Sequence, residues 1–114
     1  MIQAKTFREI VHALAEVSEA PHFGRTAFRV PTGKKRKGKP VTKIFATFDK
    51  KSHRACLKLT PADQDLFSLH DPTVIYAVPN KWGKQGWTYM ELSKVRKTVL
   101  REALKSAINA CLSA

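Results

Sequence analysis

The chain has 114 residues and a mass of 12.8 kDa, and 43% of its residues are hydrophobic. These values fit one soluble globular domain over residues 1–114 and exclude a chain that is disordered throughout. The formal net charge is +12 and the pI is near 10.1, which favours an anionic partner such as nucleic acid.

The first predicted element is a helix over residues 6–17. Thr6 and Glu9 have the spacing of a capping box, in which each side chain satisfies a backbone N–H at the helix start. Pro21 and Gly24 then interrupt the chain. The apolar residues that recur at helical spacing in this segment are Phe7, Ile10, Val11, Leu14 and Val17.

Three strands are predicted next, over residues 25–30, 41–48 and 53–59. Each alternates apolar and polar side chains with a period of two, which is typical of a sheet with one buried and one wet face. On this alternation Ile44 faces the core with Ala46 and Phe48.

A basic segment, residues 31–40, connects the first two strands. It contains no aliphatic or aromatic core residue, so we expect an inserted hairpin loop, an extended wing that moves in the absence of a ligand. Charge runs of this kind are most often solvated loops, and the alternative is a contact with a polyanion. The cations of the segment are Lys34, Lys35, Arg36, Lys37 and Lys39.

A second helix is predicted to begin after Thr60, which suits the N-cap, with Pro61 in the first helical position. Two further strands, over residues 73–78 and 87–92, are joined by a long turn, and a last helix covers residues 98–112. The order α-β-β-β-α-β-β-α predicts a two-layer α+β domain in which helices cover one face of a five-stranded antiparallel sheet.

Catalytic and metal-binding motifs are absent from the sequence. His12, His22, His53 and His70 have no metal-ligand spacing to other candidate ligands, no pair of acidic residues is placed for acid–base chemistry, and no phosphate-binding loop occurs. We therefore expect no enzyme activity, no metal and no cofactor.

Cationic residues also recur with aromatic residues outside the basic segment. On the predicted alternation, Phe45 and Tyr89 lie on the open face of the sheet. The cations expected on the same face are Arg25, Arg29, Lys43, Arg54 and Lys58. Such a face serves either as a nucleic-acid platform, as plain solvated surface or as a dimer contact.

The turn before the last strand contains Lys81, Trp82 and Lys84, followed by Trp87. Trp87 opens a strand and is expected to pack against the sheet. Trp82 either packs in the same way or stacks on a base, and the sequence does not decide between these alternatives.

The stretches "PHFGRTAFRV" (residues 21–30) and "WGKQGWT" (residues 82–88) resemble the MmcQ/YjbR family of small bacterial proteins. The resemblance extends from Phe7 to about Ala110. It implies an α-β(3)-α-β(2)-α domain of the YjbR-like, double-wing type, and members of this family are usually described as DNA-binding. The chain departs from the family pattern by inserting "PTGKKRKGKPVT" (residues 31–42) between the first two strands.

These observations together predict a cytoplasmic nucleic-acid-binding protein, with DNA as the first ligand to test and weak sequence specificity. Two separated cysteines, no bilayer-spanning run and no secretory signal support the cytoplasm and argue against a membrane partner. The alternative is a protein-interaction or chaperone-like module that binds an acidic protein, since the family's fold is related to secretion chaperones. The sequence leaves oligomerisation open.

Overall fold

The computed structural model describes residues 1–112, and within them six strands form one antiparallel sheet in the order β1-β2-β3-β4-β6-β5. The α+β class is as predicted, but the sheet has six strands instead of five. The strands are β1 (Ser18–His22), β2 (Arg25–Arg36), β3 (Lys39–Asp49), β4 (Arg54–Lys58), β5 (Ile75–Ala77) and β6 (Trp87–Glu91). The helices in these residues are α1 (Ala4–Leu14), α2 (Pro61–Ser68), α3 (Lys81–Lys84) and α4 (Lys97–Leu112).

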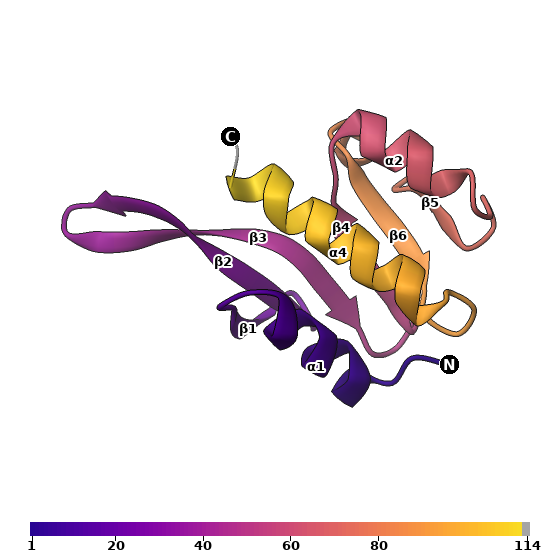
Figure 1. Cartoon of the computed structure of the whole chain (residues 1–114), viewed down its shortest axis with the longest axis horizontal. Helices are drawn as coiled ribbons and strands as arrows, with labels where there is room; N and C mark the ends of the chain where they lie inside the picture. Colours follow the sequence, from indigo (N-terminus) through magenta and orange to yellow (C-terminus); the bar gives the residue numbers. More distant parts are fainter. Residues whose placement is uncertain (113–114) are drawn as a thin grey trace.

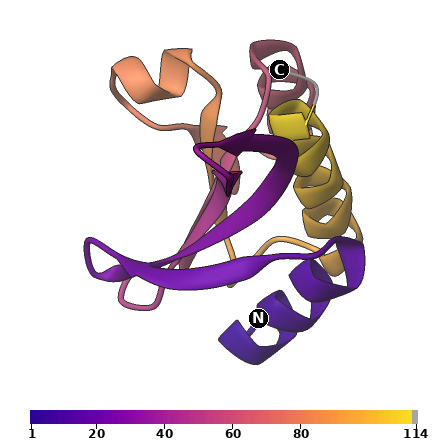
Figure 2. The same ribbon diagram turned by 90° about the vertical axis from the view of Figure 1, so that its left-hand side faces the viewer.

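The helices α1, α2 and α4 lie on one side of the sheet, and α3 and the β1–β2 turn stand on the other (Figures 1 and 2). None of the helices within residues 1–112 combines the length and the apolar character that crossing a membrane requires.

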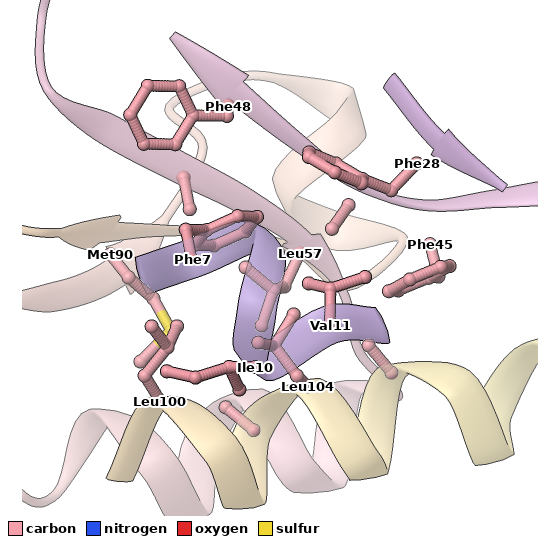
Figure 3. Packing of buried hydrophobic residues seen from close by; sticks show 14 of the residues in the cluster. Phe7, Ile10, Val11, Phe28, Phe45, Phe48, Leu57, Met90, Leu100 and Leu104 are labelled. Atoms are coloured by element: carbon pink, nitrogen blue, oxygen red, sulfur yellow. The ribbon is translucent and has the colours of Figure 1, made fainter. Parts of the chain in front are cut away.

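The core fills the space between the sheet and the helices α1 and α4 (Figure 3). The ring of Phe7 in α1 lies 5.3 Å from that of Phe28 and 5.4 Å from that of Phe48, measured between ring centroids. Leu100 and Leu104 of α4 are fully buried opposite them. Complete burial of side chains of this size stabilises the fold by roughly 1.5–3 kcal/mol each, so these contacts fix the helical layer on the sheet.

Phe45 is a core residue, which contradicts its predicted place on the open face. It is 0% exposed and lies among the core side chains (Figure 3). The register of β2 and β3 shifts between the pairs Phe28↔Ala46 and Arg29↔Ile44, so Phe45 is an extra residue in β3. Such a bulge reverses the alternation of the residues before it.

Two segments differ from the predicted elements near the N-terminus. The capping box is wrong, because α1 begins at Ala4 and its N-cap residue, Gln3, makes no side-chain capping bond within residues 1–112. The chain then forms β1 from residues expected to be irregular. This edge strand is mostly exposed, so its strand character comes from pairing with β2 and not from an apolar pattern. The predicted N-cap Thr60 is confirmed, since its hydroxyl accepts a hydrogen bond from the backbone N–H of Asp63 at 3.1 Å.

The basic segment, residues 31–40, continues β2 and β3 as a paired hairpin, and we call it the wing. Lys35 pairs with Pro40 and Arg36 with Lys39, and only Lys37 and Gly38 remain as a two-residue turn. Both turn residues have positive φ, which matches the twist of a tight hairpin. The wing projects from the body along its longest axis, where the molecule measures 43 Å (Figure 1). Its mobility stays a prediction.

Candidate nucleic-acid interface

The wing presents its cations without neighbouring acidic groups. All residues from 33 to 40 are exposed, and residues 20–48 contain neither Asp nor Glu. The ion pairs within residues 1–112 involve other cations, namely Arg8, His12, Arg25 and Lys105. The positive charge of the wing is therefore uncompensated by the part of the protein that the structure describes.

The base of the wing contains a second irregularity, between Pro31 and Lys35. The Thr32 hydroxyl donates a hydrogen bond to the backbone carbonyl of Val41 at 2.9 Å, and the Lys34 N–H donates to the same hydroxyl at 3.3 Å. Bulges increase the local twist of a ribbon. The tip of the wing is consequently turned relative to the strands of the body.

A hollow of about 410 Å³ lies on the open face of the sheet, opposite the helices α1 and α4. Its lining includes the rings of Phe23, Trp82, Trp87 and Tyr89 together with Arg25, and we call it the aromatic hollow.

Small side chains form the floor of the aromatic hollow. Ala27, Thr47, Cys56 and Tyr89 are aligned across four neighbouring strands and therefore share one face. The first three are small, and of these Thr47 and Cys56 line the hollow beside the larger ring of Tyr89. Small side chains leave room above this part of the sheet, and the larger groups that bound the hollow come from Tyr89 and from the two walls.

The first wall of the aromatic hollow is the turn between β1 and β2. His22 pairs with Arg25, so the turn consists of Phe23 and Gly24, with φ of 51° and 78°. Glycine adopts such angles freely, but a phenylalanine does so at a cost. The Phe23 side chain is 92% exposed and contacts the His22 ring edge-on at a centroid distance of 4.7 Å.

The second wall is α3, which occupies part of the predicted turn. Its N-cap residue, Asn80, accepts a hydrogen bond from the backbone N–H of Trp82 at 2.9 Å. Gly83 is required at the back of this helix, because a Cβ there would come within 1.9 Å of the Val78 carbonyl oxygen. The Trp82 side chain remains 50% exposed.

Gln64 of α2 holds this wall from behind the sheet. Its buried Nε2 lies within hydrogen-bonding distance of the carbonyl oxygens of Gly83 at 3.0 Å and Trp87 at 3.1 Å, and of the Thr88 hydroxyl at 3.0 Å. An amide NH2 has two protons, so these acceptors share them. A buried side chain with three such neighbours fixes the position of α3 relative to the sheet.

A polar network orients the Tyr89 ring. The Arg54 guanidinium lies 4.1 Å from the ring centre of Tyr89 and donates to the Tyr76 hydroxyl at 3.2 Å. Tyr76 in turn donates to the Glu91 carboxylate. The hydrogen bond to Tyr76 raises the pKa of Arg54, against the opposing effect of burial, so this cation stays charged. Arg54 therefore packs against Tyr89 on the sheet and is not part of the wing.

The floor of the hollow offers no activated nucleophile. Burial raises the pKa of the Cys56 thiol to about 11, although Arg25 and Arg54 act in the opposite direction. His22 lines the hollow, but within residues 1–112 the lining includes no Asp or Glu. The same described residues contain no group of three or more His, Cys, Asp or Glu side chains that could hold a metal ion.

The cations predicted for the open face are divided among several places. Arg25 lines the aromatic hollow, and Arg29 alternates with the buried Val30, which leaves it on the open side. Lys43 is the cross-strand partner of the buried Val30, so it lies on the helix side of the sheet and not on the open face. The bulge at Phe45 causes this change of side. The prediction of one continuous cationic face is therefore wrong.

Lys43 lines a second hollow, of about 490 Å³, together with Lys58 and with Ala110 and Cys111 of α4. The ammonium group of Lys58 donates to the carbonyl oxygen of Gln85. These two lysines lie at the end of the sheet and outside the aromatic hollow.

Lys81 and Lys84 are exposed on α3, as expected, and the Lys81 ammonium lies 5.6 Å from the Trp82 ring centre. Sequence reasoning did not find Phe23, Asn80 or Gln64. The signal for Phe23 was the motif "PHFGR", which carried the family resemblance together with "WGKQGW", and both motifs contribute residues to the lining of one hollow. Asn80 lies two residues before the second motif. No pattern in the sequence connects Gln64 with this site.

The fold and the site together define a two-layer α+β domain with helices on one face of an open antiparallel sheet. A solved structure with this architecture is that of protein DR2400 from Deinococcus radiodurans, whose domain is DUF419, the MmcQ/YjbR type. The TM-score is 0.74 at 21% sequence identity, and the match covers 95% of this chain and 77% of that one. The chain matches no protein-family model, and none of the curated proteins is significantly similar to it.

Proposed function

We propose that this protein binds nucleic acid, duplex DNA in the first place, through phosphate contacts of the wing. The observation that carries the proposal is the uncompensated charge of a paired β-ribbon that projects from the body. A two-stranded ribbon fits the major groove of B-DNA, which is about 12 Å wide. Lysine and arginine side chains along the ribbon then lie close to the phosphates on either side.

Phosphate contacts supply affinity and position without reading the bases. The wing cations are flexible side chains on an exposed ribbon, and the proposal therefore includes weak sequence specificity. It assigns no catalytic activity and no cofactor to the protein.

We also infer that the chain is a divergent member of the MmcQ/YjbR family. The motifs at residues 21–30 and 82–88 and the fold shared with DR2400 support this inference. Cys56 and Cys111 are free thiols in the described part of the chain, which is consistent with a protein of the reducing cytoplasm.

The test is a salt titration of binding to duplex DNA, single-stranded DNA, duplex RNA and single-stranded RNA of equal length. We expect duplex DNA to bind with an affinity that falls steeply as salt rises, and with little difference between unrelated sequences. Binding that survives nuclease treatment of a lysate and resides in an acidic protein, with no salt-dependent nucleic-acid binding, would support the protein-interaction alternative instead.

A further inference from the structure

Two exposed aromatic side chains, Phe23 and Trp82, line the aromatic hollow without contributing to the core. Phe23 is 92% exposed and Trp82 is 50% exposed, and they come from opposite walls. Duplex binding by the wing uses neither ring. Large exposed apolar side chains that converge on one concavity indicate a binding site.

Phe23 is a poor choice for the turn that it occupies. The first position of this two-residue turn requires a positive φ and favours Asn, Asp or Gly. Phenylalanine there neither eases the turn nor gains stability by burial. Within residues 1–112, the one aromatic contact of its ring is the edge-on contact with His22.

Several specific interactions hold the helix that carries Trp82 in place. Asn80 caps its helix, Gly83 allows the helix to approach Val78, and Gln64 fixes the helix from the core side. The ring is consequently presented from a rigid base, which lowers the entropy lost when it stacks on a ligand.

The charge around the hollow selects an anionic occupant. Arg25 lines it, Lys81 and Lys84 lie on the helix of its second wall, and the described lining contains no carboxylate. The single acidic contact of Arg25 within residues 1–112, to Asp49, is long at 3.9 Å. A ligand that is both planar and anionic satisfies the rings and the cations together.

We infer that the aromatic hollow binds an unpaired base of single-stranded nucleic acid, stacked on Phe23 and Trp82, with its phosphate near Arg25 and Lys81. This site rests on the proposed function, since it assumes that the chain binds nucleic acid. It differs from the wing because it requires an unstacked base, which duplex DNA does not offer along its length. Base stacking on aromatic side chains tolerates all sequences.

Intrinsic fluorescence reports directly on this site, because both tryptophans of the chain, Trp82 and Trp87, line the hollow. We expect single-stranded oligo-dT of about 12 nucleotides, within the range of sites on single-strand-binding domains, to quench the emission on binding. Inorganic polyphosphate and the matched duplex are expected to bind through the wing without this quenching. A mononucleotide should quench only at much higher concentration, since it lacks the additional phosphate contacts.

The decisive variant is Phe23→Asn, which removes the ring and keeps a residue that suits the turn. It should weaken oligo-dT binding roughly 5- to 150-fold, the range expected for one stacked base, and leave duplex binding unchanged. Trp82→Ala should have a similar effect. Leu66→Ala, which removes another exposed apolar side chain at 62% exposure on α2, is the matched control.

The inference is overturned if Phe23→Asn, folded by circular dichroism, binds oligo-dT within twofold of the unchanged protein. It is also overturned if polyphosphate quenches as strongly as oligo-dT, or if an acidic aromatic peptide quenches and oligo-dT does not. A failure of the proposed wing function gives a different result. In that case neutralising the wing cations leaves duplex binding and its salt dependence unchanged, while Phe23→Asn still weakens oligo-dT binding.

Discussion

The side-chain amide of Gln64 lies 3.0 Å from the carbonyl oxygen of Gly83, and it joins the middle of α2 to the short helix that carries Trp82. This bond passes from the core layer to the open face of the sheet. It makes the position of an exposed aromatic ring depend on a buried polar side chain.

Replacing Gln64 with Leu should therefore destabilise the protein and loosen α3. The carbonyl oxygens of Gly83 and Trp87 would each lose one donor and keep the backbone N–H of Gly86 and of Val78, respectively. The loss of a typical hydrogen bond costs about 0.5–1.5 kcal/mol. Urea unfolding measures the loss of free energy, and fluorescence anisotropy of a Trp87→Phe background reports on Trp82. Gln3→Leu, at an exposed position, is the control. Unchanged stability and anisotropy would contradict the role given to Gln64.

The tip of the wing should open more readily than the body. Arg36 and Lys39 are cross-strand partners of like charge, and such pairs destabilise a ribbon. We expect amide hydrogen exchange in residues 32–40 to be much faster than in residues 44–48 and to slow when salt or polyphosphate is added. The variant Lys39→Glu places opposite charges across the ribbon and should slow exchange at low salt. Equal protection in both segments would contradict this view of the wing.

Glu19 should contribute stability that is lost in acid. Burial raises the pKa of its carboxyl, but hydrogen bonds and charge interactions with His12 and Arg8 outweigh this and hold it below the ordinary value of 4.5. A carboxyl with a lowered folded pKa stabilises the fold above its unfolded pKa, and the contribution disappears as the pH falls through the folded value.

The effect of Glu19 is small because the pair is partly exposed and screened by salt. Glu19→Gln should lower the free energy of unfolding by about 0.2–1 kcal/mol at pH 7, and the two proteins should converge as the pH falls well below 4.5. Urea unfolding of both proteins at pH 7 and at pH 3 measures the difference in the free energy of unfolding. A difference that persists unchanged at pH 3 would show that the charge of Glu19 is not the cause.

Cys56 should react slowly with alkylating reagents. Its thiol pKa of about 11 leaves only about one thiolate in a thousand at pH 8, and the thiolate is the reactive form. In a Cys111→Ser background, which isolates Cys56, the rate of iodoacetamide reaction should rise about tenfold per pH unit up to pH 10. A plateau near pH 9 would mean that the floor of the hollow is more open to water than the structure indicates.

The sequence predicts the helical layer and the central strands well, because apolar spacing in them reflects burial against a single core. It does not predict β1, whose residues are exposed and gain strand structure only from pairing with β2. It also misplaces Phe45, since one extra residue in β3 reverses the alternation, and Lys43 moves with it. Bulges depend on the fit between two strands, which the pattern of one strand does not contain.

One part of the candidate site, the wing, can be predicted from the sequence, and the other part, the aromatic hollow, cannot. The wing cations are visible in the sequence because they are consecutive, and their exposure is as expected. The aromatic hollow joins residues 22–25 to residues 80–89, and it is formed by tertiary contacts. The two motifs that resembled a family supply its walls, but the sequence alone gives no indication that they line the same hollow.

The central claim is that the wing neutralises phosphates, and the salt dependence of duplex DNA binding tests it most directly. The variant in which Lys34, Lys35, Arg36, Lys37 and Lys39 are all replaced by Ser should remain folded, because these residues are exposed. Each phosphate neutralised contributes about −0.9 to the slope of log K against log salt, so the slope should become shallower by up to roughly 4 units. A folded variant that keeps both its affinity and its slope would show that the wing is solvated surface and that nucleic acid, if bound, is held elsewhere.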